Sequence, residues 1–73
     1  MKTIVTEIVI NKHNSTYKQM IELSDKFNTD RIFNNGHLQI KCCVKMSAYK
    51  AREIVHDILK CNFSQIRIKY HEK

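Results

Sequence analysis

Residues 31–45 read RIFNNGHLQIKCCVK, and the architecture of the chain can be worked out from this stretch. From residue 38 onward, apolar and polar side chains alternate with a period of two, which predicts a strand with one apolar face and one mostly basic face. The dipeptide Asn35-Gly36 precedes it, and Asn-Gly between two strand-like runs predicts a hairpin with a type I′ turn, in which both central residues have positive φ. We therefore predict a short strand at residues 31–34 and a longer one at residues 37–45.

The segment before the hairpin contains a strand and a helix. Residues 2–10 are rich in β-branched side chains and apolar on both faces, as in a central strand. After a polar loop, apolar residues at helical spacing predict a helix over residues 15–27, with Asn14 or Ser15 as its N-cap. Residues 28–30 should end this helix.

The segment after the hairpin repeats this pair in reverse order. Ser47 is a suitable N-cap for a helix whose apolar stripe continues to Leu59. Cys61-Asn62 should close the helix, because asparagine tolerates the left-handed conformation. The last strand is predicted at residues 63–70, and we expect residues 71–73 to fray.

The predicted order is β-α-β-β-α-β, so the chain belongs to the α+β class. We expect an open-faced sandwich of the ferredoxin-like kind, with a four-stranded antiparallel sheet and two helices on one face. The apolar, helix-covered face of the sheet would take Ile4, Ile8, Ile10, Leu38, Ile40, Val44, Ile66 and Ile68. The other, open face would carry Glu7, Gln39, Lys41, Lys45, Gln65, Arg67 and Lys69.

Size and composition predict one small domain over residues 1–73. With 42% apolar residues the chain can form a core, and no apolar run approaches the roughly 20 residues that span a bilayer. Glu7 and the alternation around it disfavour a signal peptide, and no small-residue cleavage site follows. We therefore expect a cytoplasmic protein without a membrane segment.

The three cysteines do not form an evident framework or metal site. Cys42 and Cys43 are adjacent, so in a strand they point to opposite faces, and Cys61 leaves an odd number. Neither the cysteines nor the four histidines show metal-ligand spacing. We expect free thiols in a reducing compartment, and no metal ion or cofactor.

The formal net charge of +6 favours a polyanionic partner such as nucleic acid. In the predicted topology Lys41, Lys45, Arg67 and Lys69 project together from the open sheet face, where they could follow a phosphate backbone. Sheets that bind RNA normally add aromatic side chains on which bases stack. The sequence predicts only Phe63 for this role, at the start of the last strand.

Residues 12–48 resemble HPr, the histidine-containing phosphocarrier family of the bacterial sugar phosphotransferase system. His13 precedes the first helix, as the phosphorylated histidine does in that family. Residues 24–30, SDKFNTD, are similar to the family's A-S-K-[FY]-[ND]-x-D, and residues 38–42, LQIKC, to its V-N-L-K-S. Asn35-Gly36 matches its hairpin turn, and Met46-Ser47 its M-S dipeptide.

The chain departs from the HPr pattern at the residues that carry phosphate. HPr has H-A-R-P where this chain has His13-Asn14-Ser15-Thr16, so the arginine that neutralises the phosphate and the proline are absent. Cys42 stands at the position of the family's regulatory serine. The family's final helix is missing, because the chain ends in a predicted strand, and HPr proteins are usually acidic. The resemblance thus implies a degenerate HPr-like module.

Three functions follow as hypotheses, and none of them is enzymatic. The first is a protein-interaction or regulatory module that docks, as HPr does, onto a phosphotransferase-system enzyme or regulator. The second is a phosphocarrier with His13 as the phosphoacceptor, because a neutral imidazole is a nucleophile and a helix N-terminus stabilises phosphate. Lys12, Asn14 and Ser15 would then stabilise the phosphate. The third is nucleic-acid binding by the basic sheet face.

Overall fold

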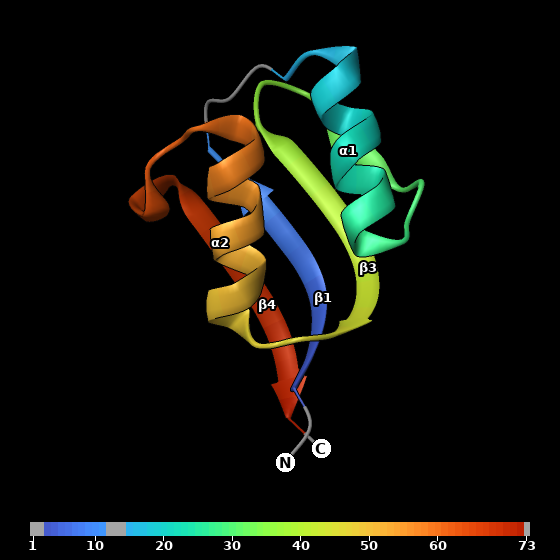
Figure 1. Ribbon diagram of the computed structural model, residues 1–73, viewed down its shortest axis with the longest axis vertical. Coiled ribbons are helices and arrows are strands. Elements are labelled where there is room, and N and C mark those ends of the chain that lie inside the picture. The colour runs from blue at the N-terminus through green and yellow to red at the C-terminus, as the bar shows by residue number, and fades with distance from the viewer. Residues whose placement is uncertain (1–2, 12–14, 73) are drawn as a thin grey trace.

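The computed structural model describes residues 3–11 and 15–72. A four-stranded antiparallel sheet has the order β2-β3-β1-β4, and both helices lie on one of its faces (Figure 1). The predicted α+β open-faced sandwich is therefore confirmed. In chain order its elements are β1 (Thr3–Ile10), α1 (Tyr17–Phe27), β2 (Ile32–Asn34), β3 (Leu38–Lys45), α2 (Ala48–Leu59), the 3-10 turn η1 (Phe63–Gln65) and β4 (Ile66–Glu72).

The helix ends are determined by local hydrogen bonds. Thr16, not Asn14 or Ser15, is the N-cap of α1, because it forms a reciprocal capping box with Gln19. Ser47 caps α2 as predicted, by accepting the backbone N–H of Lys50 at 3.0 Å. Asn28 ends α1 in the left-handed conformation, with φ 50°.

The end of α2 and the start of β4 differ from the prediction. Lys60 is the left-handed residue that closes α2, with φ 58°, whereas Asn62 is the N-cap of η1 and exchanges hydrogen bonds with Gln65. Residues 63–65 therefore form a turn and not the first part of the strand. At the other end, His71 and Glu72 pair with Ile4 and Thr3 of β1, so the prediction that they lie beyond the strand is wrong.

The hairpin between β2 and β3 is present, but its turn is one residue longer than predicted. Asn34 pairs with Leu38, which leaves three connecting residues, and Asn35 N–H donates to the His37 carbonyl at 3.1 Å. Gly36 has φ +79°, whereas Asn35 is not among the residues with positive φ, so the turn is not of type I′. As a result β2 is shifted by one residue against β3.

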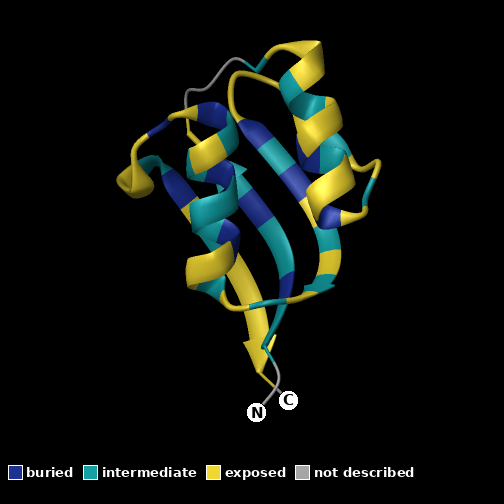
Figure 2. Cartoon of the chain, viewed as in Figure 1, coloured by how far each residue is buried: buried dark blue, intermediate teal, exposed yellow. Residues whose placement is uncertain are grey.

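A register shift in β1 between Val5 and Glu7 changes which side chains reach the core. Val5 is fully buried under the helices and pairs with Val44 and Tyr70, whereas Ile4, predicted for this face, lies on the open face opposite Lys45 and His71. Buried positions lie where the helices cover the sheet (Figure 2). The fully or nearly buried core consists of Val5, Ile8, Ile10, Leu23, Phe27, Leu38, Ile40, Ala51, Val55, Leu59, Cys61 and Ile66.

Val44 and Ile68 lie on the predicted helix-covered face, but they are only partly buried against this core. No helix in the described part of the chain combines the length and the apolar character that crossing a membrane requires.

Candidate nucleic-acid interface

The open face of the sheet gathers cations from two strands and from the residue before β2. Lys41 and Lys45 come from β3, and Arg67 and Lys69 come from β4; all four are exposed. Their pairing partners on β1 are Glu7, Ile4, Val9 and again Glu7. Because side chains alternate across each strand, these partners place the four cations on the face opposite the helices. The four cations singled out from the sequence thus share one surface.

Arg31 joins this surface, although the sequence did not single it out. Its carbonyl accepts a hydrogen bond from the Lys41 N–H at 2.9 Å, which extends the β2–β3 register by one pair. Arg31 therefore stands opposite Lys41 and is exposed. We call Arg31, Lys41, Lys45, Arg67 and Lys69 the basic sheet face.

Glu7 lies in the middle of the basic sheet face and is the one carboxylate among the described residues whose register position is there. Lys69 Nζ lies 3.1 Å from Glu7 Oε1, and the Gln39 side-chain amide donates a hydrogen bond to Glu7 Oε2. The hydrogen bond from Gln39 and then that from Lys69 lower the pKa of Glu7 below its ordinary value of 4.5. Glu7 therefore stays ionised and neutralises one of the five cations.

The lowered pKa of Glu7 predicts a pH dependence of stability. A carboxylate with a lower pKa in the folded than in the unfolded state contributes stability above its unfolded pKa, and this is lost as the pH falls through the folded value. We expect Glu7→Gln to be less stable than the wild type at neutral pH, and its free energy of unfolding to fall less below about pH 5. Urea unfolding at several pH values measures this free energy, and Glu22→Gln, which removes an exposed carboxylate of α1, is the control. Free energies of unfolding that fall in parallel with decreasing pH for the wild type and Glu7→Gln would contradict the prediction.

The aromatic residue expected on this face is not there, and another one is. Phe63 lies in η1 and packs edge-on against His56 of α2, with ring centroids 4.8 Å apart, and against Tyr49 at 6.4 Å. Phe33 of β2 pairs with Gln39 and so lies on the open face, 43% exposed. The basic sheet face thus has an aromatic neighbour at its β2 edge.

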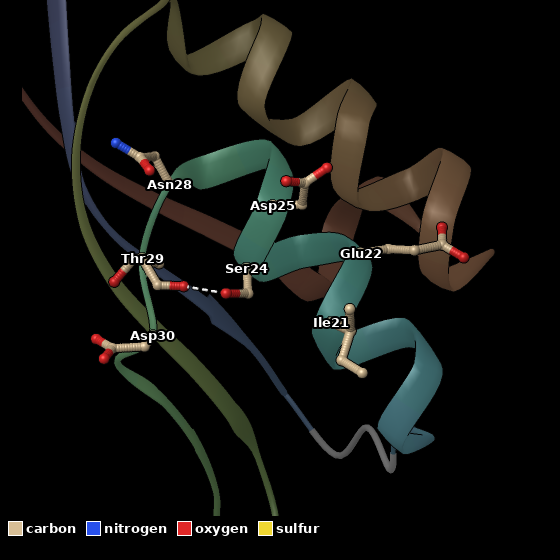
Figure 3. A pocket seen from close by; sticks show the side chains of 7 residues that line it. All are labelled: Ile21, Glu22, Ser24, Asp25, Asn28, Thr29 and Asp30. Atoms are coloured by element: carbon tan, nitrogen blue, oxygen red, sulfur yellow. Dashed lines mark hydrogen bonds between the residues drawn. The ribbon is translucent and has the colours of Figure 1, made fainter.

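Acidic side chains gather elsewhere, around a shallow hollow at the C-terminal end of α1. Glu22 and Asp25 project from the helix and Asp30 from the loop after it, and Ser24 Oγ donates to the Thr29 carbonyl between them (Figure 3). Within residues 3–11 and 15–72, no group of three or more potential ligands could hold a metal ion. These carboxylates lie outside the basic sheet face, and the last turn of α1 also carries the basic residue Lys26.

The three cysteines are free thiols in different surroundings. Cys42, at the position that the HPr resemblance assigns to a regulatory serine, lies partly buried on the helix side, and its Sγ is 3.5 Å from the Val5 carbonyl oxygen. Burial raises the pKa of Cys42 and of Cys61, so both resist forming a reactive thiolate. Cys43 is exposed on the open face, between Lys41 and Lys45.

The proposed phosphoacceptor site lies mostly outside the described residues. This applies to Lys12, His13 and Asn14, whereas Ser15 is half-buried immediately before the N-cap Thr16. The backbone N–H of Gln19 could have donated a hydrogen bond to an anion at this helix end, but it already donates to the Thr16 hydroxyl. The role of His13 as a phosphoacceptor stays a prediction.

Comparison of the chain with protein families, curated proteins and solved structures gave no significant match.

Proposed function

We propose that this protein binds nucleic acid through the basic sheet face, by contacts with the phosphate backbone. The observation that carries the proposal is that, among the described residues, five cations gather on one open face with a single carboxylate, which is itself paired to Lys69. Phosphate contacts supply most of the affinity of such interfaces and need no catalytic group. The protein would then act by binding, in the cytoplasm that its sequence predicts.

The test is the salt dependence of binding by the whole protein. A fluorescein-labelled single-stranded oligonucleotide of about twelve residues is titrated with protein, and anisotropy is read at several salt concentrations between about 50 and 200 mM. Four cations remain after Glu7 neutralises one, so we expect log K to fall against log salt with a slope of about −3. Absence of binding at the lowest salt, or a slope near zero, would refute the proposal.

A second candidate is the HPr-like docking module that the resemblance implies. It is favoured by an exposed apolar strip on α1, where Tyr17 is 76% and Ile21 51% exposed beside Met20 and Ile32. HPr proteins dock onto partner enzymes through the region of the histidine and the two helices. Such a complex would survive nuclease and moderate salt, whereas a complex on the basic sheet face would not.

A further inference from the structure

The basic sheet face meets its aromatic side chain at the edge strand β2. Phe33 pairs with Gln39, while the residue before it, Ile32, pairs with Ile40 and packs against the core. The core contact of Ile32 fixes the orientation of this short strand, so the Phe33 ring is held on the open face. An exposed ring beside the cations of the basic sheet face is a surface on which a planar base can stack.

Arg31 precedes Phe33 by two positions and therefore points to the same side. Arg31 and Lys41 line a hollow at the sheet edge together with Asn28, Thr29 and Cys43. Thr29 holds the loop there, because its hydroxyl donates to the Lys41 carbonyl at 2.6 Å and accepts the Arg31 N–H at 3.1 Å. Two cations in a hollow of this kind attract a phosphate, and a guanidinium can bind it with two parallel hydrogen bonds.

The spacing of the two features matches one nucleotide. Positions two apart along a strand are separated by about 7 Å, which is comparable to the reach from a phosphate to its own base. In a duplex the bases are already stacked on each other, so the Phe33 ring could not be used. In a single strand the base is free to turn toward the ring.

We propose that Arg31, Lys41 and Phe33 form a nucleotide subsite for single-stranded nucleic acid. Arg31 holds one phosphate and Lys41 the next one along the strand, and Phe33 stacks on the unpaired base beside them. This inference rests on the proposed function and adds the class of nucleic acid that the face selects. The sugar contributes nothing to either contact, so DNA and RNA single strands should both bind.

The experiment measures the anisotropy of three labelled probes: oligo-dU, oligo-U and a mixed-sequence DNA duplex, each about twelve residues long. We expect Phe33→Leu to weaken binding of both single strands about tenfold and to leave the duplex affinity and the salt slope unchanged. Arg31→Gln should reduce the magnitude of the slope of log K against log salt for the single strands by about 0.7, the value for one phosphate contact. Tyr17→Leu, which removes an exposed aromatic ring from α1, is the matched control and should change nothing.

Three results would overturn the subsite. They are a Phe33→Leu affinity for single strands within about twofold of the wild-type affinity, equal losses of affinity in Phe33→Leu and Tyr17→Leu, or tighter binding of the wild type to the duplex than to the single strands. A preference for only one of the two single strands would show that the sugar is read, and would overturn this scheme of contacts. Failure of the proposed function looks different, because the wild type would then bind none of the three probes. Phe33 is exposed, so Phe33→Leu should fold, and its urea unfolding curve verifies this.

Discussion

Reversing the charges of Lys41 and Arg67 together is expected to weaken binding to single-stranded nucleic acid at least about a hundredfold at low salt. Each variant carboxylate removes a phosphate contact and adds a repulsion, and the two residues stand on different strands, on either side of β1. The slope of log K against log salt should decrease in magnitude by about 1.4, since each phosphate contact on a single strand accounts for about 0.7. Anisotropy titrations over a range of salt measure both quantities.

The matched control reverses Lys18 and Lys50, which are exposed on the two helices. Each reversal changes the charge by two, so both double variants go from the formal net charge of +6 to +2. If net charge alone attracted the polyanion, the two variants would lose the same affinity, and the basic sheet face would have no special role. If the face binds, Lys18→Glu/Lys50→Glu keeps most of the affinity.

The Lys41 variant also needs a check of stability. Lys41 pairs with Glu7 across β1 and β3, so Lys41→Glu sets two carboxylates opposite each other. Like charges in such a pair cost roughly 0.2–1 kcal/mol, too little to unfold the domain. A lost affinity with a retained unfolding transition is therefore attributable to the surface. Unchanged affinity in the folded variant would contradict the proposed function.

The grouping of the four predicted cations followed from the sequence because β3 and β4 keep a regular period of two. In β3 every second residue from Leu38 to Val44 is more buried than its neighbours, so Lys41 and Lys45 had to share the opposite face. In β4 the same holds for Arg67 and Lys69, beside the inward-facing Ile66 and Ile68. The capping signal at Ser47 was equally local, and it too agreed with the structure.

Arg31 and Phe33 were missed because the length of one turn controls the face of a three-residue strand. A two-residue Asn35-Gly36 turn would pair Asn34 with His37 and Phe33 with Leu38, which puts the Phe33 ring on the helix side. The observed three-residue connection pairs Phe33 with Gln39 instead. A shift of one residue moves every side chain of the strand to the other face, and Asn-Gly does not determine that length unambiguously.

The register shift in β1 could not be predicted from the sequence either, and here the reason is different. Residues 3–6, Thr-Ile-Val-Thr, are all β-branched, so the strand is acceptable whether the odd-numbered or the even-numbered residues face the core. Only the packing decides: Val5 must fill the space opposite Val44 and Tyr70, while Glu7 two positions later must reach Lys69 on the open face. Both requirements hold only if the register changes between them.

The register shift buries Val5 and places Ile4 on the open face, and a substitution of the buried Val5 has the largest expected effect on stability. Val5→Asp should abolish cooperative folding, because Val5 is fully buried among apolar side chains, and an unpaired buried carboxylate costs several kcal/mol. A domain of this size has a total stability of only about 4–11 kcal/mol. Ile4→Asp should fold with a loss of about 1 kcal/mol or less, since its carboxylate would face Lys45 and His71 on the open side.

Urea unfolding followed by circular dichroism compares the two variants, which have the same formal charge and lie on the same strand. Strict alternation from Ile8 would bury Ile4 and expose Val5, so a folded Val5→Asp beside an unfolded Ile4→Asp would show that β1 has no register shift.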